Sequence, residues 1–258
     1  MAQYYFVVTS LPVLSFESRP DMTFEQFLDL LKLNLSDGDF TKIKTLLFLV
    51  DLINIRALWL GLPFDVRGNF SAKELEEALL TKEGLPSDLV EFLDRYDTTQ
   101  ERLKYFSSLY ASFFARASQE ESGFLKKYFV FEREVRLILT ALRAKEMNRD
   151  LAKELQFEDP TDPLVMDLLV QKEGNDLSVP LEYEDLKEQF MAHRSEPMAL
   201  NRAMLEYRFK KIEEMQQGGP FSIEAVLSYA ARMMIVESWW NLDEKQGRSL
   251  VGDLSKYG

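Results

Sequence analysis

The chain has 258 residues, with 31 Lys and Arg against 43 Asp and Glu, which gives a formal net charge of −12. Apolar residues make up 46% and charged residues 29%, a balance typical of folded globular proteins, and the negative charge disfavours nucleic acid as a partner. With no Cys and one His, the composition excludes disulfides, thiolate nucleophiles and metal centres that need paired histidines.

The first predicted element covers Tyr4 to Val8, a run of aromatic and β-branched residues that is followed by Pro12. This composition favours a short strand or a buried extended arm. A single strand cannot form a sheet, so the run leaves the fold class to the rest of the chain.

Helix-start signals follow at intervals along the chain. Three are capping boxes, in which a Ser or Thr is followed three residues later by Glu or Gln, and three are prolines placed for the first turn of a helix. The boxes begin at Thr23, Ser71 and Thr98, and the prolines are Pro163, Pro180 and Pro197. Because the apolar residues between these signals keep helical spacing, the sequence predicts an all-α protein built as a multi-helix bundle.

The connections between the predicted helices are short, so we expect one compact helical body over residues 1–258. No export signal is evident near the N-terminus. The most apolar segment, Leu46 to Leu62, contains Asp51, Asn54 and Arg56, which argues against a membrane-spanning helix. These features predict a cytoplasmic protein.

Three segments, residues 48–61, 131–145 and 233–242, are apolar nearly all the way round a helix and form weak pseudo-repeats. When Asp51 is aligned with Glu134, an acid, a polar spacer and an aliphatic run recur in the first two segments. The third segment carries Glu237 and fits more loosely.

The charged residues of these segments need partners, because an uncompensated buried charge costs several kcal/mol. Asp51 and Asn54 share a helix face, and Glu132 precedes Arg136 by four residues, the favourable order for an ion pair. Two interpretations stay open: a polar network that fixes helix register or meets a partner protein, and a satisfied structural pair inside one fold.

Adjacent tryptophans, Trp239 and Trp240, point about 100° apart on a helix, so one of them is expected to face a groove or a partner. His193 has no serine elbow or second ligand that would accompany it. No phosphate-binding loop occurs either. We therefore predict no catalytic residue, no cofactor and no metal site.

The segment from Glu132 to Lys145, with Glu134 and Arg136, resembles the recurring helix of the central-stalk component designated C, or d, in V/A-type rotary ATPases. Asp51-Leu-Ile-Asn54-Ile-Arg56 resembles another form of the same helix. The opening residues 4–12, followed by residues 24–28, are similar to an uncharacterised bacterial family encoded within V-type ATPase operons.

This resemblance implies a funnel of three pseudo-equivalent helix groups that binds the rotor shaft subunits and sits on the proteolipid ring of the complex. The implied role is noncatalytic coupling, with the protein cytoplasmic and peripheral to the inner membrane through the complex. The alternative is a helical ligand-binding protein or enzyme with a carboxylate-lined cavity around Asp51, Glu134 or Glu237.

Overall fold

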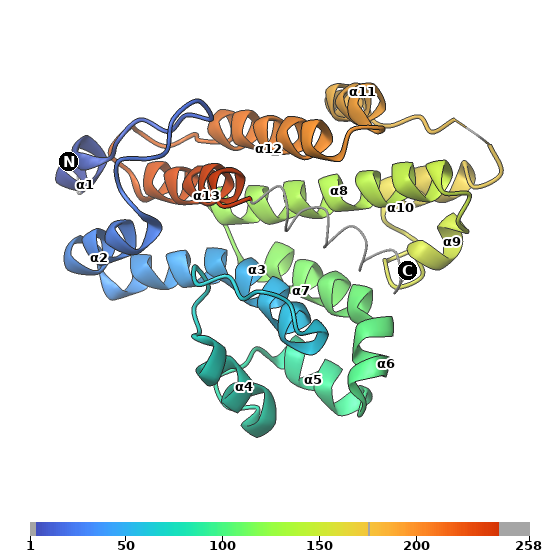
Figure 1. Cartoon of the computed structure of the whole chain (residues 1–258), viewed down its shortest axis with the longest axis horizontal. Coiled ribbons are helices and arrows are strands. Elements are labelled where there is room, and N and C mark those ends of the chain that lie inside the picture. The colour runs from blue at the N-terminus through green and yellow to red at the C-terminus, as the bar shows by residue number, and fades with distance from the viewer. Residues whose placement is uncertain (1–3, 175, 243–258) are drawn as a thin grey trace. The chain divides into compact units, whose positions relative to one another are not determined.

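The computed structural model describes residues 4–174 and 176–242 of the chain (Figure 1). Within these ranges the chain forms thirteen α-helices and one 3-10 helix, and it contains no strand. The predicted all-α fold class is therefore confirmed.

The helices fall into a shorter and a longer group. The elements are α1 (Tyr5–Ser10), α2 (Phe24–Asn34), α3 (Asp37–Leu60), α4 (Ala72–Thr81), α5 (Ser87–Arg95), α6 (Thr99–Lys104), α7 (Phe106–Glu120), α8 (Gly123–Glu146), α9 (Leu151–Glu154), α10 (Pro163–Val170), η1 (Leu181–Tyr183), α11 (Glu184–His193), α12 (Pro197–Glu214) and α13 (Ile223–Trp240). The three pseudo-repeat segments lie on α3, α8 and α13, which we call the repeat helices.

The chain divides into two compact units. Residues 1–40 and 185–258 belong to one, which we call the terminal unit, and residues 41–184 form the other, the middle unit. The expectation of one compact body over the whole chain stays a prediction.

The core of the terminal unit is built on α13. Helix α12 lies alongside α13, and α1 and α2 pack against it (Figure 1). Val226, Ala230 and Met233 of α13 are fully buried, which agrees with the apolar pattern of this helix. On the α2 side, the rings of Phe27 and Tyr229 lie 5.4 Å apart.

The core of the middle unit is rich in aromatic rings. Helix α7 packs against α8 and α5. The ring of Phe113 on α7 lies 5.5 Å from that of Phe48 on α3 and 5.4 Å from that of Phe129 on α8. Apolar contact among three long helices therefore holds this unit together.

The prediction of a strand or extended arm over Tyr4–Val8 is wrong, because residues Tyr5–Ser10 form helix α1. Tyr4 and Val7 are both buried, and their spacing of three places them on one side of the helix. The hydroxyls of the last two helical residues donate to carbonyls one turn earlier. Burial of that side outweighs the strand preference of the aromatic and β-branched residues.

The predicted helix starts are confirmed with one exception. Thr23, Ser71 and Thr98 each form a complete capping box, and Pro163 and Pro197 occupy the first turns of α10 and α12. Pro180 instead precedes a 3-10 helix as its capping residue. Local hydrogen bonds within one turn explain why these positions could be predicted.

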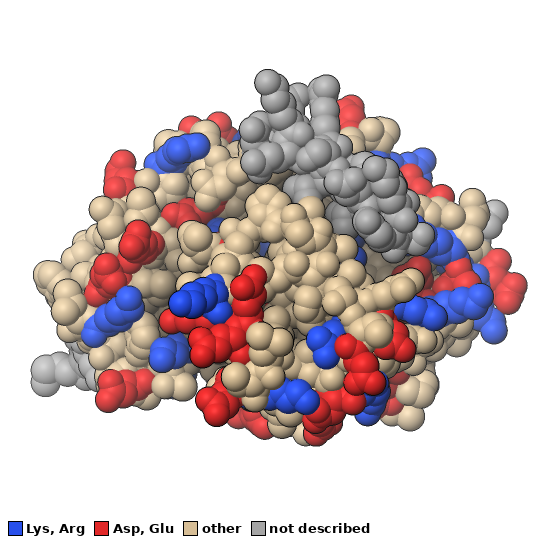
Figure 2. All heavy atoms as spheres, turned by 60° about the horizontal axis from the view of Figure 1, so that its bottom comes forward, with Lys and Arg blue, Asp and Glu red and all other residues tan. Residues whose placement is uncertain are grey.

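Charged side chains of both signs share the surface. On the face shown in Figure 2, Lys and Arg lie among Asp and Glu, and no extended basic patch forms among the residues described on that face. None of the helices in the described ranges combines the length and hydropathy needed to cross a bilayer.

Candidate functional site

Asp51 lies in the middle of α3 and is fully buried. Its carboxylate accepts hydrogen bonds from the backbone N–H of Asn69 at 2.8 Å and from the Asn69 side-chain amide at 2.6 Å. The backbone N–H of Phe70 adds a weak contact at 3.5 Å. Asp51 therefore ties the segment that leads into α4 to the body of α3.

Asn54 holds the same connection one turn further along α3. Its amide donates to the carbonyl of Asp65 and accepts from the Asp65 backbone N–H, both at 2.8 Å. The carboxylate of Asp65 pairs with Arg67 at 2.5 Å. Burial opposes ionisation of Asp65, but hydrogen bonds and the positive charge of Arg67 outweigh it and lower its pKa.

Gly68 is required by this arrangement for steric reasons. A Cβ atom at this position would lie 2.3 Å from Oδ1 of Asp51 and 3.1 Å from Nδ2 of Asn54. The absence of a side chain lets the backbone approach the buried carboxylate closely. Burial raises the pKa of Asp51, although the hydrogen bonds from Asn69 and Phe70 act in the opposite direction.

On α8, two arginines bind the connection between α9 and α10. Arg133 lies 3.1 Å from Glu158 and 2.9 Å from Asp162, and Arg136 also pairs with Glu158. The side chain of Glu158 is 6% exposed. Asp162 caps α10, so Arg133 holds the residue at which that helix starts.

The predicted ion pair between Glu132 and Arg136 is not the one observed, since Arg136 pairs with Glu158. Glu132 is half-buried on α8. The Arg136 guanidinium also lies 5.6 Å from the ring centre of Tyr110. Helical spacing predicted a local partner, but the carboxylate folded against α8 comes from 22 residues further along the chain.

Glu134 accepts a hydrogen bond from the phenol of Tyr183. Burial raises the pKa of Glu134, partly offset by that hydrogen bond. Arg56 of α3 is exposed, and its guanidinium lies 6.0 Å from the ring centre of Phe106. Of the charged repeat positions, Arg56 is therefore the most open to solvent.

Glu237 on α13 accepts a hydrogen bond from the backbone N–H of Phe24 at 2.7 Å. Phe24 is the first residue of α2. Its N–H is one of those that a helix leaves without a partner in its first turn. Glu237 therefore anchors the start of α2 on α13.

The two tryptophans at the end of α13 are both half-buried. The Arg202 guanidinium lies 5.3 Å from the ring centre of Trp239, and Arg19 donates to the carbonyl of Trp240 at 3.2 Å. The indole N–H of Trp240 is buried with no hydrogen-bond partner among the described residues. His193 is the last residue of α11 and is half-buried.

The three repeat helices thus share a task that their sequences alone did not show. Asp51 of α3 binds the residues before α4, Arg133 of α8 binds the cap of α10, and Glu237 of α13 binds the first residue of α2. Residues missed by sequence reasoning are the partners Asp65, Asn69, Glu158 and Tyr183. Of these, only Asn69 had a local signal, its place between Gly68 and the capping box at Ser71.

The chemistry of these groups is internal binding. Each acid discussed accepts a hydrogen bond or forms an ion pair with a group of its own unit. Within residues 4–174 and 176–242, no group of three His, Asp or Glu side chains is arranged to hold a metal ion.

A family model described as "Protein of unknown function (DUF2764)" matches residues 1–257. The chain is similar to uncharacterised proteins from Chlamydia muridarum and Chlamydia trachomatis, each 32% identical over 99% of this chain and 98% of the relative. A further uncharacterised protein, from Chlamydia pneumoniae, is 30% identical with the same coverage. No solved structure matches the chain.

Proposed function

We propose that this chain, which belongs to the DUF2764 family of proteins of unknown function, is a noncatalytic coupling subunit of a V/A-type rotary ATPase. In this role it links the rotor shaft subunits to the membrane proteolipid ring on the cytoplasmic side. The proposal starts from the resemblance of residues 51–56 and 132–145 to the recurring helix of the C, or d, component of the central stalk in those complexes.

The observation that carries the proposal is the shared task of the repeat helices, each of which holds the start of another helix through a charged side chain. A subunit that passes torque needs joints that resist bending. Breaking a buried hydrogen bond to a charged group costs about 1.5–3 kcal/mol, so such joints keep neighbouring helices moving together.

The alternative, a cavity lined by Asp51, Glu134 or Glu237, has less support. Hydrogen bonds from Asn69 reach both carboxylate oxygens of Asp51, and Glu134 and Glu237 each accept one from elsewhere in their own units. A ligand would have to displace these bonds. An enzyme or binding protein would instead offer polar groups that converge on an open space.

Affinity purification of the tagged full-length chain from its own membranes in mild detergent tests the proposal. We expect ATPase shaft and ring subunits to be recovered with it, and the purified chain alone to show no ATPase activity. Recovery of the folded chain without any rotary ATPase subunit would overturn the proposal.

A second experiment addresses the joints. Asn54→Ala frees the connection held at Asp65 but leaves Asp51 in place. We expect the variant complex to assemble and hydrolyse ATP, with less ion transport per ATP. Asn34→Ala, which removes the same side chain from an exposed position, is the matched control and should transport normally.

A further inference from the structure

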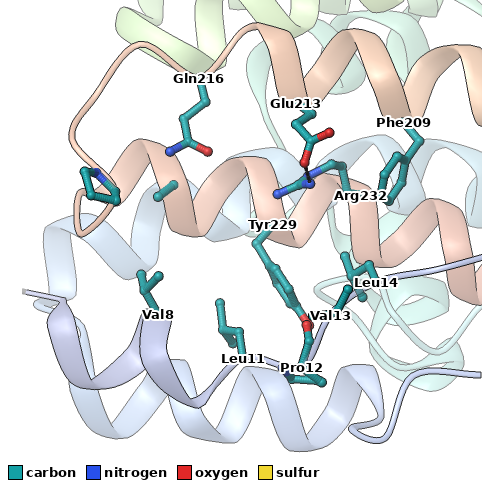
Figure 3. A pocket seen from close by; sticks show the side chains of 12 residues that line it. Val8, Leu11, Pro12, Val13, Leu14, Phe209, Glu213, Gln216, Tyr229 and Arg232 are labelled. Atoms are coloured by element: carbon teal, nitrogen blue, oxygen red, sulfur yellow. Dashed lines mark hydrogen bonds and ion pairs between the residues drawn. The ribbon is translucent and has the colours of Figure 1, made fainter.

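A pocket of about 520 Å³ lies in the terminal unit, between the N-terminal segment and helices α12 and α13 (Figure 3). Its volume is within the range of small-molecule sites, about 300–1,000 Å³. The repeat acids Asp51, Glu134 and Glu237 are not among its lining residues. The pocket is therefore separate from the features that support the coupling role.

The two sides of the pocket differ in chemistry. Figure 3 shows the hydrocarbon side chains of Val8 and Leu11 on the side of the N-terminal segment, facing the polar side chains of Glu213, Gln216 and Arg232 on α12, its end and α13. An apolar wall opposite a polar one fits an amphipathic molecule better than a fully polar or fully apolar one.

Arg232 is the buried charge of this pocket, with its side chain 14% exposed. Its Nη1 pairs with Glu213, and its Nε makes a long hydrogen bond of 3.4 Å to the Ser228 carbonyl. Its Nη2 has no hydrogen-bond partner among the described residues. A guanidinium carries five N–H donors, so Arg232 has donors left for a further acceptor.

Glu213 neutralises this cation incompletely, because its side chain is 60% exposed and water screens its charge. Burial lowers the pKa of Arg232 in spite of the opposing effect of Glu213. The Arg232 guanidinium also lies 5.3 Å from the ring centre of Phe209, which keeps it in place. A second anion beside Arg232 would compensate the cost of its burial.

The rest of the wall is already held in position. The phenol of Tyr229 donates to the carbonyl of Pro12 at 2.9 Å, which ties the N-terminal segment to α13 beside the pocket. The Gln216 side chain adds an amide that has no hydrogen-bond partner among the described residues and can donate to an anion. Binding would thus require little rearrangement of the backbone.

We propose that this pocket binds an aliphatic carboxylate, with the carboxylate on Arg232 and Gln216 and the hydrocarbon chain along Val8 and Leu11. The charge complementarity of Arg232 selects an anion, and the facing apolar side chains select an aliphatic tail. This site neither requires nor replaces the coupling role.

Isothermal titration of the full-length chain with decanoate, decanol and decyltrimethylammonium, each below its micelle concentration, tests the chemistry. We expect decanoate to bind at a single site about tenfold or more tightly than the other two, the contribution of a charge-assisted hydrogen bond. Equal binding of decanol would overturn the proposal by showing an apolar cavity only, and so would the absence of decanoate binding.

Variants locate the site. Arg232→Gln should weaken decanoate binding about tenfold or more. Arg202→Gln is the matched control, because Arg202 also pairs with a glutamate and lies over an aromatic ring but does not line the pocket. Retained binding in Arg232→Gln, or an equal loss in both variants, would refute the assignment.

Glu213→Gln provides a test that does not depend on removing the arginine. It removes the carboxylate that competes for Arg232, so decanoate should bind about two- to fivefold more tightly, as expected for an exposed ion pair. A purely structural ion pair predicts unchanged or weaker binding, which would contradict the proposal even if Arg232→Gln failed to fold.

Discussion

Replacing Gly68 by alanine tests whether the buried carboxylate of Asp51 holds the connection between α3 and α4. The new Cβ would lie 2.3 Å from Oδ1 of Asp51, whereas an unstrained contact needs roughly 3.5 Å. Either the carboxylate or the backbone must move by about 1 Å. The hydrogen bond from the Asn69 N–H, now 2.8 Å long, would then be lost or badly weakened.

The expected loss of stability follows from three contributions. Overpacking costs about 1–3 kcal/mol, and loss of a hydrogen bond to a charged group costs about 1.5–3 kcal/mol. Replacing glycine returns about 0.4–1 kcal/mol by restricting the unfolded chain. We therefore expect Gly68→Ala to lower the free energy of unfolding by about 2–5 kcal/mol.

Urea unfolding followed by tryptophan fluorescence measures this loss in the unit that contains the site. The chain has three tryptophans, and Trp59 belongs to the middle unit whereas Trp239 and Trp240 belong to the terminal unit. In a Trp239→Phe, Trp240→Phe background, Trp59 on α3 reports the unfolding of the middle unit. The substitution should shift the midpoint to lower urea concentration.

Two further variants make the reasoning refutable. Gly38→Ala is the matched control, because Gly38 lies on the helix that carries Asp51 with nothing within 4 Å of a new Cβ, and it should be neutral or stabilising. In an Asp51→Ala background the clash is relieved, so Gly68→Ala should cost much less than alone. An effect of Gly68→Ala as small as that of Gly38→Ala, or equal costs with and without Asp51, would refute the interpretation.

Three other substitutions probe the remaining anchors by urea unfolding. Glu158→Ala leaves two half-buried guanidiniums of α8 without their shared partner and should cost about 3–5 kcal/mol; a cost below about 1 kcal/mol would mean that the ion pairs are exposed in solution. Burial raises the folded pKa of Glu134, so its contribution to stability is present at low pH and lost as pH rises through that pKa. Glu134→Gln, which can still accept from Tyr183, should flatten this decline above pH 4.5, the ordinary pKa of glutamic acid, and an unchanged pH profile would contradict the assignment. Glu237→Ala removes an acceptor from the Phe24 N–H and should cost about 1–2 kcal/mol, whereas Glu237→Gln should cost less.

The helix starts could be predicted from the sequence because a capping box is satisfied within four residues. Thr23, Ser71 and Thr98 needed only their own neighbours to form their hydrogen bonds. The apolar character of α13 was equally readable, and most of its residues are buried. In each case the information lies within one or two turns of a helix.

The partners of the buried polar groups could not be predicted in the same way. Asp51 and Asn54 were expected to share a helix face as a pair, but each binds a different part of the connection before α4, 11 to 19 residues away in the sequence. Arg136 likewise binds Glu158. Helical spacing states which side chains share a face, but it does not state which loop folds onto that face.

The sequence by itself determined the all-α class and the places where helices begin, since both depend on short-range hydrogen bonds and on the period of the apolar residues. Tertiary structure alone decided that the aromatic run at Tyr5–Ser10 is a helix and which groups neutralise the acids of the repeat helices. Both outcomes depend on burial against segments far away in the chain, where the gain from covering apolar surface and pairing charge exceeds any local preference.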